Sequence, residues 1–331
     1  MVSDLKGKRI LFFSPAFFSY EQIISEKMRS MGASVEYYDE RAVKSALERA
    51  VLKFCPSVFN RKAEKYYSRI IEEQKGKSFD YILIIKGDMV SKKTLRKLRE
   101  AFPMAKLCLH LWDSMENIPH IGEKLGLFDY ATSFDRNDCL DNPKLVLRPL
   151  FYAKEFETEK RETDKDIVFC GTIHSDRYAI IKCVRKWCEE NNRRFYIFQY
   201  LQSKFIYYFY KLTKSSFKDT KLNDFSYEKK PLSEISEIEA SGKAILDIQH
   251  PKQTGLTMRT IEMIGMGKKL ITTNADIVNY DLYNPANVCV IDRNNPVIDG
   301  TFLDKDFVPV DESVRARYSL ERWIMDVLGE M

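Results

Sequence analysis

The sequence has no run of about 18 apolar residues, so no segment has the length and composition of a transmembrane helix. Its start, MVSDLKGKRILFFSPAFFSY, has one short apolar run that Ser14 and Pro15 interrupt, with no small-residue cleavage site after it. We interpret this start as a first strand and not as a signal peptide. The seven cysteines are odd in number and form no C-x-x-C pair, which is typical of free thiols in a reducing compartment. These absences predict a cytoplasmic protein.

Two common nucleotide-binding motifs are missing as well. The end of the first predicted strand lacks a G-x-G-x-x-G turn, and no G-x-x-x-x-G-K-[ST] sequence occurs in the chain. The first motif lets the backbone approach a dinucleotide pyrophosphate, and the second cradles phosphates. NAD-dependent and P-loop chemistry therefore lose most of their support.

The composition is that of a folded protein with a mild excess of basic residues. Hydrophobic residues make up 44% and charged residues 31% of the 331 positions, which excludes disorder for most of the chain and allows two domains. Lys and Arg number 53 and Asp and Glu 48, which gives a net charge of +5. A charge this small permits an anionic partner without demanding one, and we expect no nucleic-acid partner.

Short apolar segments alternate with amphipathic ones along most of the chain, which predicts parallel sheets with helical crossovers. In the first half the expected strands are 9–13, 34–38, 81–85, 106–111, 130–133 and 145–147. In the second half they are 166–170, 195–200, 244–248, 269–273 and 288–291. The sequence therefore predicts two α/β units, each with three layers.

The polar run YAKEFETEKRETDKD, residues 152–166, predicts a linker between the two units. We expect an N-terminal domain over 1–152 and a C-terminal domain over 153–311. Apolar residues then recur at helical spacing near the end of the chain, at Leu320, Trp323, Ile324, Val327 and Leu328. We expect the terminal helix, residues 312–331, to pack back on the first domain.

Two segments depart from the alternation of short strands and helices, and both combine basic and aromatic residues. Residues 41–77 include Phe54, Phe59, Tyr66 and Tyr67, and residues 204–230 include KFIYYFYKLTK. One interpretation is contact with an anionic acceptor or with an anionic membrane surface. The other is that these helices only cover the sheets.

Ligands of open α/β sheets bind beyond the carboxyl ends of the strands, so the strand exits are the candidate sites. The exit CGTIHSDR places Gly171 after a strand, Thr172, His174 and Ser175 as hydrogen-bonding groups, and Arg177 at the start of a helix. A phosphate can be held by such a turn. The alternative is an ordinary βα turn with a surface arginine.

The strongest constellation is ILDIQHPKQTGLTMRTIEMIGMGKKLITTN. Its strand ends near His250, and we expect Gly255 to open a helix whose N-terminus offers an anion site. On that helix Arg259 and Glu262 share a face, as a binding pair or as a simple surface ion pair. Two glycines, 265 and 267, are expected to end the helix.

Here the sequence resembles a known family. The motifs F-C-G-T-x-H-x-D-R, G-L-T-x-R-x-x-E, M-G-K-K-L-I-T-T-N and Y-D-L-Y are similar to the donor half of GT-B glycosyltransferases. The similarity is greatest to the bacterial spore-maturation-type group, and L-H-L-W-D-S in the first half resembles a strand of that group that ends in Asp. The resemblance implies two Rossmann-like domains that face a central cleft.

It also implies roles for residues of the second half. Glu262 matches the helix glutamate that binds the ribose hydroxyls of the nucleotide. Gly255 and Leu256 match the element that faces the diphosphate and sugar. The glycine turn and basic residue near the diphosphate are matched by Gly171, Thr172 and Arg177. Thr254 stands where one large branch of the fold has the first glutamate of an E-x7-E pair.

The chemistry of transfer requires a device that neutralises the departing diphosphate. The four histidines show no ligand spacing, so we expect a helix dipole with Arg and Lys and no metal or other cofactor. Asp113 is the first candidate for the base of an inverting reaction and Asp88 the second. Either can instead cap a helix or turn, and a retaining enzyme needs no such base. His250 is expected to touch phosphate or sugar.

The sequence therefore predicts a metal-independent glycosyltransferase that moves a hexose or related sugar from a nucleotide-sugar donor to a glycan or lipid-linked acceptor. Its expected role is bacterial surface polysaccharide synthesis, at the inner face of the membrane. Two alternatives remain: a non-catalytic nucleotide- or sugar-binding protein, and a nucleotide-sugar epimerase of the same architecture. An epimerase would act without any acceptor.

Overall fold

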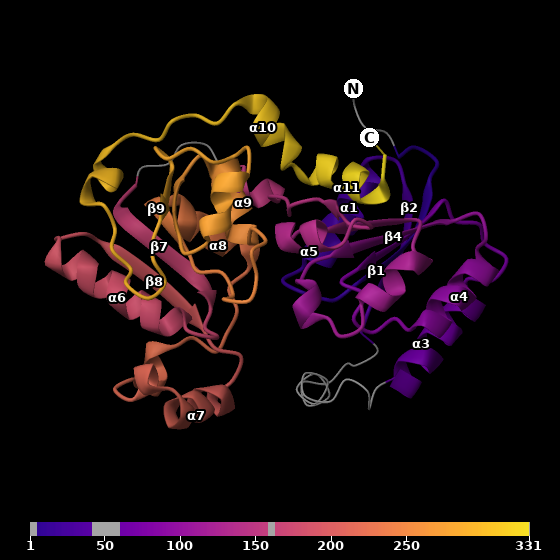
Figure 1. Ribbon diagram of the computed structural model, residues 1–331, viewed down its shortest axis with the longest axis horizontal. Coiled ribbons are helices and arrows are strands. Elements are labelled where there is room, and N and C mark those ends of the chain that lie inside the picture. The colour runs from indigo at the N-terminus through magenta and orange to yellow at the C-terminus, as the bar shows by residue number, and fades with distance from the viewer. Residues whose placement is uncertain (1–4, 42–59, 158–162, 331) are drawn as a thin grey trace. The chain divides into compact units, whose positions relative to one another are not determined.

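The computed structural model describes residues 5–41, 60–157 and 163–330. The chain forms two compact units (Figure 1): Met1–Leu150 with Ser319–Met331, called unit 1, and Phe151–Tyr318, called unit 2. Each unit is built around one parallel sheet with helices packed against it. The predicted α/β class with two parallel-sheet domains is confirmed.

The sheet of unit 1 has the order β2-β1-β3-β4-β5-β6, and every neighbouring pair is parallel. Its strands are β1 (Arg9–Ser14), β2 (Ser34–Asp39), β3 (Tyr81–Ile85), β4 (Lys106–Leu111), β5 (Tyr130–Ser133) and β6 (Val146–Leu147). Its helices include α1 (Tyr20–Ser30), α3 (Asn60–Glu73), α4 (Lys92–Ala101), α5 (Arg136–Asp141) and α11 (Leu320–Leu328). The chain changes direction across the sheet between β1 and β3, so this is the switch point at which such folds bind ligands.

The sheet of unit 2 has the order β11-β10-β9-β7-β8, again with parallel pairs. Its strands are β7 (Lys165–Thr172), β8 (Phe195–Tyr200), β9 (Gly242–Asp247), β10 (Lys269–Thr272) and β11 (Val288–Val290). Its helices are α6 (Arg177–Glu190), α7 (Lys204–Thr213), α8 (Leu232–Ala240), α9 (Met258–Met266) and α10 (Glu312–Arg317), with short 3-10 turns between. The switch point of unit 2 lies between β7 and β9.

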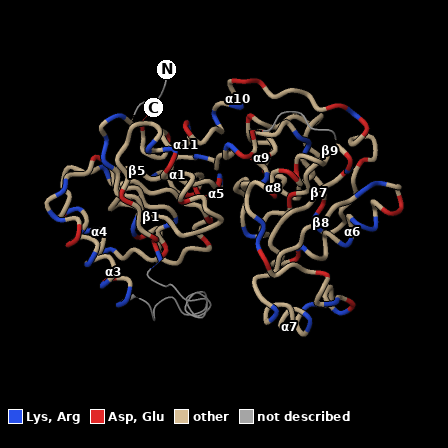
Figure 2. Tube along the Cα trace, turned by 180° about the vertical axis from the view of Figure 1, so that it is seen from behind, with Lys and Arg blue, Asp and Glu red and all other residues tan. Residues whose placement is uncertain are grey.

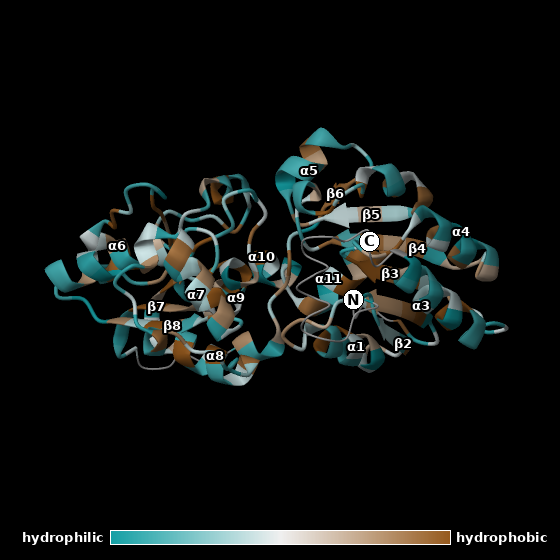
Figure 3. Cartoon of the chain, turned by 90° about the horizontal axis from the view of Figure 1, so that it is seen from below, coloured by the Kyte–Doolittle hydropathy of each residue, from teal (hydrophilic) through white to brown (hydrophobic). Residues whose placement is uncertain are grey.

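The central strands are buried on both faces, which explains why they are continuous apolar runs. All of β3, and β1 and β4 except for their first residues, are buried. The hydropathy colouring shows the same contrast between apolar strands and half-polar helices (Figure 3). All eleven predicted strands are therefore confirmed, with ends shifted by two residues at most.

Helix α11 is the last element of the chain and packs on unit 1. Its Trp323 is fully buried, and the Trp323 ring lies edge-on to His110 of β4 with centroids 5.0 Å apart. The buried Arg148 holds the helix through an ion pair with Asp326, 2.8 Å from Nε to the carboxylate. The terminal helix thus closes the core of the first unit.

The observed unit boundaries differ from the expected ones. Tyr152, Ala153 and Phe156 lie in the expected linker, yet they are buried in unit 2. The expected helix over 312–331 is two helices, α10 in unit 2 and α11 in unit 1, because the chain leaves the helical path at Tyr318 and Ser319 caps a new helix. The part of the linker at 158–162 lies outside the described residues.

Candidate functional site

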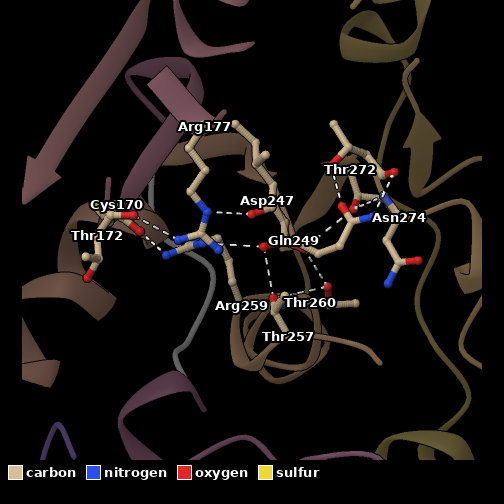
Figure 4. A network of polar contacts seen from close by, with 12 residues as sticks. Cys170, Thr172, Arg177, Asp247, Gln249, Thr257, Arg259, Thr260, Thr272 and Asn274 are labelled. Atoms are coloured by element: carbon tan, nitrogen blue, oxygen red, sulfur yellow. Dashed lines mark hydrogen bonds and ion pairs between the residues drawn. The ribbon is translucent and has the colours of Figure 1, made fainter. Parts of the chain in front are cut away.

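The carboxyl ends of β7 and β9 bring together several of the predicted residues of unit 2 (Figure 4). The fully buried carboxylate of Asp247 ends β9 and accepts hydrogen bonds from the hydroxyls of Thr257, at 2.9 Å, and Thr260, at 3.1 Å. Thr257 also caps α9, since its hydroxyl accepts from the Thr260 backbone N–H. This fixes the start of α9 against the end of β9.

The prediction that Gly255 opens the helix is wrong. Helix α9 begins at Met258, and Gly255 and Leu256 belong to the loop before it. Asn274, which follows β10, ties this loop down by donating to the carbonyl of Thr254 at 2.9 Å. Leu256 is fully buried, so the loop is part of the packed core of unit 2 and approaches the helix N-terminus in a fixed path.

Arg259, on the first turn of α9, connects the helix to β7. Its guanidinium donates to the carbonyl of Cys170 and lies 3.3 Å from Glu239 and 3.4 Å from Asp247. Burial acts to lower the pKa of Arg259, but the carboxylates of Glu239, Asp247 and Glu262 outweigh it and raise the pKa. Arg259 is therefore a buried cation held in an acidic environment, and not the surface ion-pair member that was the alternative.

Gly171 has a steric role in this arrangement. It lies within β7 and not after it, and a β-carbon there would be 2.9 Å from Nη2 of Arg259. It would also be 3.2 Å from the Phe169 ring, over which Arg259 lies. The absence of a side chain at 171 makes room for the guanidinium.

Two glutamates lie on the acidic side of Arg259. Glu262 is 5% exposed on α9, and Glu239 is fully buried at the end of α8. Burial raises the pKa of Glu239 to about 8, and the nearby Arg259 only partly opposes this, while Glu262 adds to it. One carboxylate oxygen of Glu239 has no hydrogen-bond partner among the described residues. Glu239 was not predicted from the sequence, because nothing in the pattern of residues along α8 distinguishes it from the other glutamates of that helix.

Arg177 spans the switch point. Its side chain donates to the carbonyl of Thr172, the last residue of β7, at 2.9 Å, and to that of Ile248, just after β9, at 2.6 Å. Burial lowers its pKa to about 10, so Arg177 stays charged at neutral pH. Arg177 thus links the ends of β7 and β9. Its contact with a diphosphate stays a prediction.

A second polar group lies at the same strand exits. The rings of His174 and His250 are 5.8 Å apart, and Nδ1 of His250 accepts from the Lys252 N–H. Arg293, from the segment after β11, bonds both carboxylate oxygens of Asp176 at 2.7 and 2.8 Å. Arg293 was not expected from the sequence, since it lies in a loop without a motif.

The end of α9 matches its prediction in part. Gly267 adopts a left-handed conformation with φ of 60° and ends the helix. Gly265 lies inside the helix, where a β-carbon would be 2.9 Å from the carbonyl of Phe156. Gly265 is therefore required by close packing and not by helix termination.

In unit 1 the two candidate bases share one lysine. Nζ of Lys86 lies 3.2 Å from Asp113 and 3.5 Å from Asp88. Asp113 also accepts from Asn117 at 3.0 Å, so both of its oxygens are held by donors. Lys86 itself has a left-handed φ of 75°, a strained conformation of the kind that clusters at functional sites.

Asp88 has a further partner that the sequence did not indicate. Its side chain hydrogen bonds to that of Glu40, a fully buried residue just after β2, and Glu40 also accepts from the Met89 N–H at 2.9 Å. Burial and the Asp88 charge raise the pKa of Glu40 well above its usual range. The pKa of Asp88 is lowered, because the Glu40 bond, Lys86 and Arg41 outweigh burial. These opposite pKa shifts favour a protonated Glu40 beside an ionised Asp88.

The sequence contains two Asp-x-Asp triplets, 164–166 and 304–306, whose paired carboxylates are possible metal ligands that the expectation of a metal-free site did not consider. Both lie at the other end of the sheet, away from the exits of β7 and β9: Asp166 is near the start of β7, and Arg193 contacts both Asp166 and Asp304. Asp166 also pairs with Lys243 at 2.9 Å. Across 5–41, 60–157 and 163–330, no group of three or more His, Cys, Asp or Glu is placed to hold a metal ion.

Comparison with known proteins gives matches in structure only. No family model and no curated protein matches the sequence. HepE of Anabaena, solved with UDP and glucose, aligns with a TM-score of 0.58 and 10% identity over 97% of this chain and 99% of that chain. A glycosyltransferase from Rickettsia africae aligns with a TM-score of 0.55 and 12% identity over 98% of each chain. UDP-GlcNAc 2-epimerase from Neisseria meningitidis, solved with UDP-GlcNAc, aligns with a TM-score of 0.52 and 8% identity over 98% and 100%.

Identities this low show the fold alone, which is that of the GT-B class with its two Rossmann-like units. The narrower resemblance to the spore-maturation-type group stays a prediction. No helix of the described residues is both long and apolar enough to cross a membrane.

Proposed function

We propose that this chain is a glycosyltransferase that uses a nucleotide-sugar donor. The observation that supports the proposal most is the assembly at the β7 and β9 exits. There a fixed helix N-terminus, a buried arginine and the nearly buried Glu262 lie together at the switch point of a Rossmann-like sheet. This position and these groups support binding of a nucleoside diphosphate.

In this proposal Glu262 binds the ribose hydroxyls, since a carboxylate accepts two hydrogen bonds well. The loop of Thr254, Gly255 and Leu256, together with the N-terminus of α9, faces the diphosphate and sugar. Arg177 and Arg259 hold the strand exits in place and supply positive potential, and His250 contacts phosphate or sugar. The helix dipole and these cations stabilise the leaving group without a metal.

The transfer itself exchanges one bond for another. An acceptor hydroxyl attacks the anomeric carbon, the bond from that carbon to the diphosphate oxygen breaks, and the nucleoside diphosphate leaves with the electron pair. In an inverting reaction Asp113 takes the hydroxyl proton. Its two hydrogen-bonded oxygens are held by Lys86 and Asn117, which would orient the base toward an acceptor.

The proposed acceptor is a glycan or lipid-linked sugar in bacterial surface polysaccharide synthesis, with transfer of a hexose or related sugar in the cytoplasm, at the inner face of the membrane. Resemblance in the motifs of both halves supports this setting. The proposal does not specify the donor nucleotide. Among the similar structures, HepE was solved with UDP and the epimerase with the nucleotide sugar UDP-GlcNAc.

The experiment is incubation of the full chain with a panel of nucleotide sugars, with and without glycan and lipid-linked acceptors. Release of free nucleoside diphosphate that depends on acceptor is the expected result. Conversion of the nucleotide sugar to its epimer without acceptor would instead support an epimerase. The structural similarity to a UDP-GlcNAc 2-epimerase is the reason to test for this activity. Tight donor binding without turnover under any condition would support a binding protein.

A further inference from the structure

Helix α7 exposes a stripe of large apolar side chains. Phe205, Tyr208, Phe209 and Leu212 are 78%, 57%, 53% and 87% exposed. They are three, four and seven positions apart, so they lie on one side of the helix. We call this side the α7 face.

The opposite side of α7 anchors the helix to unit 2. Tyr207 is buried, and its hydroxyl donates to the carbonyl of Thr220 at 2.9 Å. Tyr210 packs against Phe217 with ring centroids 5.2 Å apart, and Ser203 caps the helix start. The α7 face is therefore presented outward by a helix whose other side is fixed.

The surroundings of the α7 face are basic. Residues 204–221 contain five lysines and one acidic residue, Asp219. Lys204, Lys218 and Lys221 are exposed, while Lys211 and Lys214 are bonded to carbonyls of unit 2. Lysines are visible along this part of the chain in Figure 2. An apolar stripe with flanking cations is complementary to an anionic bilayer surface.

We propose that the α7 face docks unit 2 on an anionic lipid bilayer, with the phenyl rings and Leu212 in the interface and the lysines on the headgroups. The helix has ten residues and a length of about 15 Å, half of the hydrocarbon thickness, so it lies along the surface and does not cross it. Tyr and Phe suit this interface, because their rings are apolar while the Tyr hydroxyl stays hydrated.

A protein partner fits the α7 face less well. A stable protein interface takes about 20 to 30 residues from each side, whereas this face offers four apolar residues on one short helix. Cations around the rim contribute little to a protein interface unless the partner is strongly acidic. They contribute directly to binding at an anionic membrane.

The other basic segment gives a different result. In its described part, Tyr67 is fully buried and Tyr66 bonds the carbonyl of Asp39. These aromatic side chains cover the sheet of unit 1, as the alternative interpretation held. Its residues 42–59, with Phe54 and Phe59, lie outside the described residues.

The test measures binding of the full chain to sucrose-loaded vesicles by co-sedimentation at low salt. Vesicles of equal parts phosphatidylglycerol and phosphatidylcholine are expected to bind the protein at least tenfold better than vesicles of phosphatidylcholine alone, and added salt should weaken binding. The double variant Phe205→Ser, Leu212→Ser should lose at least tenfold in binding. Its residues are exposed enough for the fold to tolerate the change, which circular dichroism checks.

A second test variant, with changed charge, and two matched controls accompany this variant. Met104→Ser removes an equally exposed apolar side chain, 88% exposed, from unit 1 and should bind like the wild type. Lys204→Glu, Lys218→Glu should lose binding, while Lys182→Glu, Lys186→Glu on α6, with the same charge change, should retain it.

Equal binding to neutral vesicles, or equal losses in the controls, would overturn the proposal. So would a wild-type dimer that the Phe205→Ser, Leu212→Ser variant dissociates without a change in vesicle binding, because the α7 face would then join two copies. This inference extends the proposed transfer to lipid-linked acceptors. The binding assay contains neither donor nor acceptor, so its failure and a failure of the proposed activity are separate results.

Discussion

Gly171 and Arg259 occupy the same small space: a β-carbon on Gly171 would lie 2.9 Å from the Nη2 atom of Arg259. Gly171→Ala should therefore displace the guanidinium from the carbonyl of Cys170, because the strand backbone cannot move away from its neighbours. Overpacking of this kind costs about 1 to 3 kcal/mol. We expect a lower midpoint of urea unfolding, and weaker binding of the nucleotide donor measured by calorimetric titration.

The matched control is Gly300→Ala, where a β-carbon would meet no atom within 4 Å and the backbone is not left-handed. This substitution should change the free energy of unfolding by about 0.5 kcal/mol or less. Equal effects of the two alanines would show that Gly171 is not constrained by Arg259.

Glu262→Ala should weaken nucleotide binding by about 1.5 to 3 kcal/mol, the usual value for a hydrogen bond to a charged group. Calorimetric titration with a series of nucleoside diphosphates measures this loss. Glu237→Ala, an exposed glutamate on α8, is the control and should bind as the wild type does. Unchanged affinity in a folded Glu262→Ala variant would remove its role at the ribose.

The sequence predicted the strands well because both sheets are parallel and buried. A strand such as β3, YILII, is apolar at every position, so its identity does not depend on which face is inward. The terminal helix was predicted for a similar reason, since its apolar spacing places Trp323 and Ile324 on one buried side. Local pattern was sufficient in these cases.

The environment of the site could not be predicted in the same way. Arg259 pairs with Glu239, twenty positions earlier, and Asp88 pairs with Glu40, forty-eight positions earlier. Neither pairing has a periodic signal, because it depends on how α8, β2 and β3 come together in space. The start of α9 was misplaced for a local reason. Gly255 was expected to open the helix, but the cap is Thr257, whose hydroxyl also donates to Asp247.

The stability of unit 2 should depend on pH through Glu239. Its pKa is raised by burial to about 8 in the folded protein, compared with an ordinary value of 4.5. Below pH 4.5 Glu239 is protonated in both the folded and the unfolded state, so it does not make the free energy of unfolding depend on pH. Above that pH the folded state holds the extra proton, so stability falls as pH rises toward 8, by at most about 1.4 kcal/mol for each pH unit.

Glu239→Gln removes this titration. The difference in melting temperature between the variant and the wild type should therefore shift in favour of the variant from pH 5 to pH 9. Glu237→Gln on the same helix should show a constant difference. A difference for Glu239→Gln that stays flat, or shifts toward the wild type, would show that Glu239 is ionised in the folded protein at neutral pH.

Transfer activity should survive removal of divalent ions. The charge near the proposed diphosphate comes from Arg177, Arg259 and the N-terminus of α9, and both Asp-x-Asp triplets are at the other end of the β7 sheet. An assay in excess chelator should keep at least half of the activity. Complete loss that magnesium or manganese restores would require a metal at the donor.

Asp113 and Asp88 should have different roles, Asp113 as the catalytic base and Asp88 as a structural carboxylate. Asp113→Asn keeps the shape and the contact with Lys86 but cannot take a proton, so kcat should fall about 10²- to 10⁴-fold with donor affinity unchanged. Asp88→Asn should instead lower the melting temperature more than kcat, because it disrupts the bond to the buried Glu40 and leaves Arg41 and Lys86 with less negative charge. Steady-state kinetics and thermal unfolding of both variants decide the matter. If Asp113→Asn turns over at a tenth of the wild-type rate or faster, Asp113 is not the base, and a retaining reaction that needs no base becomes the better description.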